Sequence, residues 1–179
     1  QRRATVVESL GRLGDPAVGA AAPALMDDES AAPALRAAAV NIVAATGTGA
    51  TFEDFVTRVR HGTTPQEERR YMFALADFPG AAEADHLLRL VDESVIRTQD
   101  IPLLLSRALG NASTGPKVWA WVSDHWDDLV PRLANNTIPR IASGVVALAD
   151  PALSDGIHAF FAERPLPQAG KTLDQYLER

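Results

Sequence analysis

The chain has 179 residues, of which 46% are hydrophobic and 22% are charged, a composition that suits one globular domain with its own core. Its formal net charge of −6 argues against non-specific binding to nucleic acid, which requires a positive surface. No apolar run approaches the ~20 residues that a membrane span needs, no signal peptide is visible, and no cysteine could form a disulfide or a thiolate metal site. We therefore expect a cytoplasmic protein that binds neither nucleic acid nor membranes.

Apolar residues repeat with helical spacing along the chain, and no segment shows the alternation of a strand. Phe52, Phe55, Val56 and Val59, for example, follow the i, i+3, i+4, i+7 pattern of an amphipathic helix. The helices expected from such patterns cover residues 3–13, 16–28, 33–46, 51–61, 65–78, 82–94, 100–109, 116–129, 137–149, 151–163 and 171–179. The fold class is therefore predicted to be all-α.

Start and stop signals bound several of these helices. Asp15-Pro16 and Asp150-Pro151 each pair an N-cap residue with a proline at the first helical position. Thr64-Pro65-Gln66-Glu67 adds the glutamate of a capping box. The glycines expected to end helices are Gly47, Gly62, Gly80 and Gly110. These signals support the boundaries that the apolar pattern predicts.

The expected helices also show a longer repeat. Those that begin at residues 33, 65, 100 and 137 are spaced by 32 to 37 residues, the length of a helix-pair repeat. Short helices cannot bury an apolar face alone, so we expect them to stack as antiparallel pairs. This predicts an α-solenoid, a HEAT/armadillo-like superhelix, formed by residues 1–179 as a single helical domain. The repeat is structural, because the units share no residue consensus.

The stretch from Asn111 to Leu129 is the most distinctive part of the chain. It opens with an Asn-x-x-x-Gly loop and continues into a predicted helix that carries all three tryptophans. Trp119 and Trp126 are seven residues apart and share one face, where their indoles are expected to anchor neighbouring helices. Trp121 points away from that face, which leaves packing and a platform for a peptide as its two interpretations.

This stretch resembles the signature of the C-terminal helical domain of aminopeptidase N-type zinc peptidases, the endoplasmic-reticulum-aminopeptidase-like domain. In that family an Asn-x-x-Gly loop leads into a helix reading roughly Ala-Trp, Asn-Trp-Asp and Leu. This chain has one extra loop residue, and it has His125 in place of the Asn. The segment Ile96-Arg97-Thr98-Gln99-Asp100 resembles the family's Ile-Arg-x-Gln-Asp element. Phe160-Phe161 resembles its paired phenylalanines, and residues 171–179 resemble its closing helix.

The composition also suggests a source. Only two of the 17 basic residues are Lys and 31 residues are Ala, which is typical of a high-GC bacterium.

The resemblance implies a parent enzyme that removes N-terminal residues from peptides with zinc held by His-Glu-x-x-His and a further Glu. This chain has neither that motif nor the family's Gly-Ala-Met-Glu-Asn loop, which grips the free amine of the substrate. Its histidines, at least 25 residues apart, are His61, His86, His125 and His158. We therefore expect no catalytic and no metal-binding residues here, zinc in the parent enzyme alone, and no peptidase activity from the isolated chain.

The closest approach to a ligand cluster is His125 with Asp124, Asp127 and Asp128. His125 and Asp128 share a helix face at i, i+3. We interpret the cluster as a solvated acidic helix end, with a metal site as the alternative.

The candidate peptide contacts are Arg97, Arg107, Asn111 and Trp121. The first three are polar residues near predicted helix junctions, where caps and ion pairs between repeats would also explain them. In the intact enzymes of the family this domain covers the catalytic cleft. The resemblance therefore implies that residues on its concave surface can contact the distal part of a peptide.

The sequence thus predicts a non-catalytic C-terminal fragment of a larger peptidase. Its role would be to enclose the active-site chamber and to control which peptides enter. Its partners would be the N-terminal and catalytic domains of the same chain and the peptide substrate. The alternative is a free-standing HEAT-like scaffold that binds a protein or peptide on its concave face. An upstream His-Glu-x-x-His would support the first interpretation, and a start codon near Gln1 the second.

Overall fold

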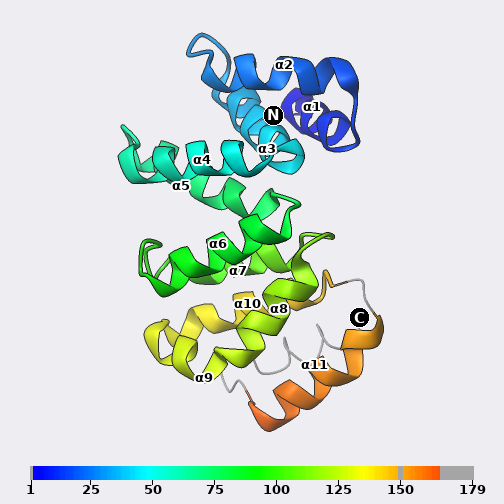
Figure 1. Cartoon of the computed structure of the whole chain (residues 1–179), viewed down its shortest axis with the longest axis vertical. Helices are drawn as coiled ribbons and strands as arrows, with labels where there is room; N and C mark the ends of the chain where they lie inside the picture. Colours follow the sequence, from blue (N-terminus) through cyan, green and yellow to red (C-terminus); the bar gives the residue numbers. More distant parts are fainter. Residues whose placement is uncertain (1, 149–150, 166–179) are drawn as a thin grey trace. The chain divides into compact units, whose positions relative to one another are not determined.

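The computed structural model describes residues 2–148 and 151–165, and all regular structure in these two ranges is helical (Figure 1). The elements in chain order are α1 (Arg2–Arg12), α2 (Pro16–Asp27), α3 (Pro33–Thr46), α4 (Gly49–His61), α5 (Pro65–Ala74), η1 (Leu75–Asp77), α6 (Ala81–Asp92), α7 (Ile101–Leu109), α8 (Gly115–Asp124), α9 (Trp126–Leu129), η2 (Val130–Arg132), η3 (Asn135–Thr137), α10 (Ile138–Val145) and α11 (Pro151–Glu163). The all-α prediction is confirmed for this part of the chain. The expected helix at 171–179 and the cap residue Asp150 lie outside the described residues. No helix in the described ranges is long and apolar enough to span a membrane.

The chain divides into two compact units, Gln1–Glu83 and Ala84–Arg179. In the first unit, α1 packs against α3 and α2 joins the two. Gly11 lies directly on the side chain of Ile42, where an added Cβ would come within 2.6 Å. Asn41 Nδ2 donates a hydrogen bond to Glu8 Oε1 at 2.9 Å. The contact positions advance in the same direction along both helices, so α1 and α3 run parallel.

The core of the first unit is aromatic. Phe55 meets both Tyr71 and Phe78 edge to face, with ring centroids 4.9 Å and 5.5 Å apart. Phe52 also meets Phe78 edge to face, at 5.1 Å. All four rings are at most 1% exposed. The stripe predicted on residues 52–56 therefore joins α4 to α5 and to Phe78, the residue that follows η1.

The observed caps match the predicted ones with two corrections. Asp15 Oδ1 accepts hydrogen bonds from the Ala17 and Val18 amides at 3.0 Å, as an N-cap should. Thr64 Oγ1 accepts one from the Glu67 amide at 3.2 Å, but the Glu67 carboxylate bonds Thr63 rather than completing a capping box with Thr64. Gly47, Gly62 and Gly110 are C-caps, whereas the prediction for Gly80 is wrong: it stands just before α6, two residues after Phe78 ends η1.

In the second unit, α7 and α10 pack side by side and run parallel. An added Cβ on Gly144 would come within 2.7 Å of the Ser106 backbone, so the two helix backbones nearly touch. A Cβ added to Gly110 would lie 3.7 Å from the Ala147 Cβ, which is an ordinary contact distance. Both pairs are 37 or 38 residues apart, which matches the repeat predicted from the helix starts at 100 and 137.

Two tryptophans form the second aromatic core. Trp119 is 6% exposed and Trp126 is 4% exposed, and both pack against Phe160 and Phe161 of α11 at centroid distances of 5.2 to 5.8 Å. Their predicted role as packing anchors is confirmed. The continuous helix predicted over 116–129 is wrong, because the chain leaves helical geometry at His125 (φ −102°, ψ 9°) and restarts as α9.

Candidate functional site

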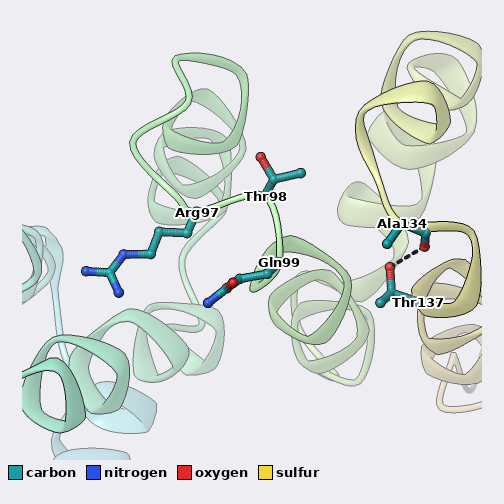
Figure 2. Close-up of a pocket in the computed structure, with 5 residues that line it drawn as sticks. All are labelled: Arg97, Thr98, Gln99, Ala134 and Thr137. Carbon is teal, nitrogen blue, oxygen red and sulfur yellow. Dashed lines mark hydrogen bonds between the residues drawn. The ribbon is translucent and has the colours of Figure 1, made fainter.

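The loops that lead into α7 and α10 border a surface pocket of about 350 Å³ (Figure 2). Arg97, Thr98 and Gln99 line it from the α7 side, and Ala134 and Thr137 line it from the α10 side. Because α7 and α10 run parallel, their N-terminal loops lie at the same end of the pair. The parallel packing of these two helices therefore creates the pocket.

Local hydrogen bonds shape both walls of this pocket. The Asp100 amide donates to the Arg97 carbonyl at 2.8 Å, which closes a turn just before α7. On the other wall, the Thr137 amide and hydroxyl both donate to the Ala134 carbonyl, at 2.8 and 2.7 Å. Prolines at the second positions of α7 and α10 suit helix starts, where amides lack intrahelical acceptors.

The side chains around the pocket are largely uncharged where they face one another. In Figure 2 the Arg97 guanidinium extends away from Ala134 and Thr137. Thr98 and Gln99 are exposed at the rim. The surface that lines the pocket is nevertheless mostly apolar, because carbon atoms of these five residues make up most of it.

Arg107 and Asn111 lie at the other end of α7. This helix has nine residues and is therefore about 13 Å long, since each residue rises ~1.5 Å. Arg107 is half-buried in its last turn. Asn111 Oδ1 accepts a hydrogen bond from the Ser113 amide at 3.0 Å, which fixes the loop that leads into α8. Arg97, Arg107 and Asn111 all have interaction partners within the chain, as their structural interpretation requires.

The loop after Asn111 explains part of the family signature. The Gly115 amide donates to the Asn111 carbonyl at 2.7 Å, and Thr114 is 4% exposed. A Cβ on Gly115 would come within 2.4 Å of the Leu109 carbonyl oxygen, so this position requires glycine. The Asn and Gly of the signature thus hold the end of α7 against the start of α8.

Trp121 lies on the surface of α8 and stacks on His125. The two rings are 4.5 Å apart between centroids and inclined by 15°, and His125 Nδ1 is 2.9 Å from the Trp121 carbonyl oxygen. Both side chains are half-buried. Trp121 therefore points off the Trp119–Trp126 face, as the sequence predicts, but its indole already has an aromatic neighbour.

The four candidate contacts do not converge on one site. Arg97 borders the pocket, Arg107 and Asn111 mark the far end of α7, and Trp121 belongs to the stack on α8. The sequence missed Thr98, Gln99, Ala134 and Thr137 as pocket residues. The 37-residue spacing between the helix starts expected at residues 100 and 137 could have predicted that these two starts lie side by side.

The acidic residues near His125 are the sequence's closest approach to a ligand cluster. Over residues 2–148 and 151–165, no three His, Cys, Asp or Glu side chains gather closely enough to hold a metal ion. Asp124, Asp127 and Asp128 are exposed, Asp127 pairs with Arg164 at 3.5 Å, and the His125 ring stacks on Trp121. This geometry suits the acidic helix end that the sequence predicts.

Comparison with known proteins gives the relationship of the chain. The family model described as the ERAP1-like C-terminal domain matches residues 1–179. The chain is also 29% identical over 119 residues to the glutamyl aminopeptidases of Mus musculus, Rattus norvegicus and Homo sapiens. Each match covers 63% of this chain and 12% of the relative, so the chain corresponds to a small part of these proteins.

Proposed function

Since the chain belongs to the ERAP1-like C-terminal domain family, we propose that it is the non-catalytic C-terminal part of a zinc-dependent aminopeptidase of the aminopeptidase N type. The family match over every residue carries this proposal. The glutamyl aminopeptidases to which the chain is similar are about eight times longer than the matched segment. They leave ample room for a catalytic domain elsewhere in such a polypeptide.

In this proposal, catalysis and chamber formation are carried out by different domains. The parent enzyme would remove N-terminal residues from peptides with a zinc-activated water. The metal ligands would come from a His-Glu-x-x-His motif in another domain, because this sequence contains no such motif. The present chain would contribute shape and contacts to the chamber in which the reaction takes place.

The proposed architecture is an α-solenoid of helix pairs that walls the chamber and limits which peptides enter. In such a repeat, corresponding helices of successive pairs run parallel and pack on one another. The parallel packing of α1 on α3 in the first unit, and of α7 on α10 in the second, supports this architecture. Helix starts at residues 33, 65, 101 and 138 keep the expected repeat length through the chain. A peptide that extends out of the active site would then lie along the helices of this segment.

Production of the longer polypeptide that contains this segment tests the proposal. We expect about one zinc per polypeptide by elemental analysis, and chelator-sensitive release of 4-nitroaniline from aminoacyl 4-nitroanilides. The 179-residue chain alone is the control and should do neither. Zinc-dependent turnover by the isolated chain, or a longer polypeptide with no zinc and no turnover, contradicts the proposal.

A free-standing HEAT-like scaffold is the second candidate. The pocket between the α7 and α10 loops supports it, because a mostly apolar pocket of about 350 Å³ could receive a side chain of a peptide without any catalytic domain. An open reading frame that starts near residue 1 would favour this function. An upstream His-Glu-x-x-His would favour the peptidase.

A further inference from the structure

Helix α1 and the turn that follows it expose an apolar face made of Val6 and Leu10 in the helix and Leu13 in the turn. These side chains are 57%, 42% and 85% exposed. They are three of the five large hydrophobic residues that are exposed in the described part of the chain; the other two, Leu103 and Val146, lie in the second unit. Single exposed apolar residues are ordinary, but a cluster on one helix marks a surface that binds another molecule or segment.

The exposed face lies opposite the face of α1 that is already packed. Ala4 and Gly11 are buried, and Gly11 rests on Ile42 of α3. Because residues advance by about 100° around a helix, Val6 and Leu10 fall on the other side. Leu13 continues this face from the following turn, where its amide donates to the Ser9 carbonyl at 3.0 Å. Helix α1 is therefore apolar on two sides, as is a helix with a neighbour on each side.

The first unit shows what those neighbours should be. Helix α3, the next in the parallel series, packs against both α1 and α5. Helix α1 has α3 on one side, while the described residues of the first unit supply nothing to cover the other. A further parallel helix on this side of α1 would continue the series.

We propose that the α1 outer face, formed by Val6, Leu10 and Leu13, binds an amphipathic α-helix from the part of the same longer polypeptide that precedes residue 1. This inference rests on the proposed function, in which the chain is one segment of a larger peptidase. The matched relatives, of which the alignment covers 12%, are long enough to supply such a helix. The partner helix carries an apolar stripe with acidic residues beside it, opposite the exposed Arg2 and Arg3.

Charge disfavours a second copy of this chain as the occupant. The α1 helix carries Arg2, Arg3 and Arg12 but a single acidic residue, Glu8. Glu8 already accepts from Asn41, and Arg12 reaches Asp77 at 3.1 Å. Two copies paired through this face would bring their arginines together without acidic residues to offset them. A helix with acidic flanks meets no such repulsion.

Thiol labelling tests the inference, because the chain has no cysteine of its own. Val6→Cys reports on the outer face, and Val146→Cys is the matched control at a position 40% exposed in the second unit. Each variant is made in the 179-residue chain and in the longer polypeptide, and maleimide labelling is followed at the peptide level by mass spectrometry. Leu13→Cys repeats the test at a second position of the face.

In the longer polypeptide, labelling at positions 6 and 13 should slow at least about tenfold, since a covered thiol reacts only through local opening. Labelling at position 146 should change little. Equal rates at position 6 in both proteins, or equal slowing at positions 6 and 146, overturn the inference. Protection in the 179-residue chain that rises with concentration overturns it in favour of a second copy.

Aminopeptidase activity of the same longer polypeptide is assayed separately. Protection without activity refutes the proposed function alone, and activity without protection refutes this inference alone.

Discussion

The tryptophans of α8 and α9 differ in what surrounds their indoles. Trp126 is 4% exposed and meets Phe160 and Phe161 edge to face, at 5.4 and 5.6 Å. Trp121 is half-buried and stacks on one partner, His125. The same residue type thus stabilises a core at one position and covers a surface at the other.

Removal of the two indoles should separate these roles. Trp126→Ala is expected to lower the free energy of unfolding by about 3–5 kcal/mol, because it leaves a cavity between α9 and α11. Trp121→Ala, the control, should cost about 1 kcal/mol, since it removes a half-exposed aromatic stack. Urea denaturation of both variants measures the difference. Equal losses would mean that the helix face assigned to Trp126 is wrong.

Glu67 makes the stability of the start of α5 dependent on pH. The Thr63 hydroxyl donates to Glu67 Oε2 at 2.7 Å, and this hydrogen bond, assisted by the Thr63 amide, lowers the pKa of Glu67 below its ordinary value of 4.5. A lowered pKa in the folded state stabilises the fold above the unfolded value, and the stabilisation is lost as the pH falls through the folded pKa.

Thr63→Val should therefore reduce stability at pH 7, and the difference from the unmodified protein should shrink as the pH falls below 4.5. Thr64→Val is the matched control. It removes a cap that accepts from a backbone amide and involves no titrating group, so it should cost about 1 kcal/mol at every pH. Urea denaturation between pH 7 and pH 3.5 compares the two. A Thr63→Val deficit that stays constant over this range would contradict the assignment.

At the scale of the helices, close packing of α7 on α10 depends on Gly144. An added Cβ would come within 2.7 Å of the Ser106 backbone, which cannot move aside as a flexible side chain could. Gly144→Ala should therefore destabilise the protein by about 1–3 kcal/mol. Gly156→Ala in α11 is the control in the same unit: no atom lies within 4 Å of its Cβ, so it should stabilise by about 0.5–1 kcal/mol. Chemical denaturation gives both values, and equal signs would show that the helices do not touch at Gly144.

Helix existence could be predicted from the sequence because periodicity, caps and prolines act locally. The prediction of 33–46 matches α3 residue for residue, and Pro33 at the first position shows why. The break at His125 could not be predicted, because its apolar pattern continues through the break. At the break, the His125 ring nitrogen Nδ1 lies 2.9 Å from the Trp121 carbonyl oxygen, and Trp126 is buried in the core.

The candidate site was harder to predict than the helices, since it depends on which helices are neighbours. Arg97 could be found because it belongs to a recognisable segment, but Ala134 and Thr137 have no distinctive pattern of their own. They become part of a surface only when α10 lies parallel to α7. Sequence spacing predicts such a repeat, whereas the direction of the Arg97 side chain requires the structure.

At the scale of the whole molecule, the proposed function predicts that Arg97 or Arg107 affects the binding of long peptides. If either arginine faces the chamber, it would bind the carboxylate end or an acidic residue of a long peptide by charge-assisted hydrogen bonds. Contacts so far from the zinc should affect binding of long peptides more than the chemical step. The structural interpretation, in which both arginines only join helices, predicts a change in stability instead.

Arg97→Ala and Arg107→Ala in the longer polypeptide distinguish these interpretations. At the position that contacts peptide, KM for long peptides should rise about tenfold, since a hydrogen bond to a charged group contributes ~1.5 kcal/mol or more. The kinetic constants for a single-residue chromogenic amide should stay nearly unchanged, because that substrate is too short to reach this segment. Arg89→Ala, at an exposed position of α6, is the control for loss of a surface charge. Equal losses on long and short substrates, or a lower Tm with unaltered kinetics, would assign both arginines to packing between helices.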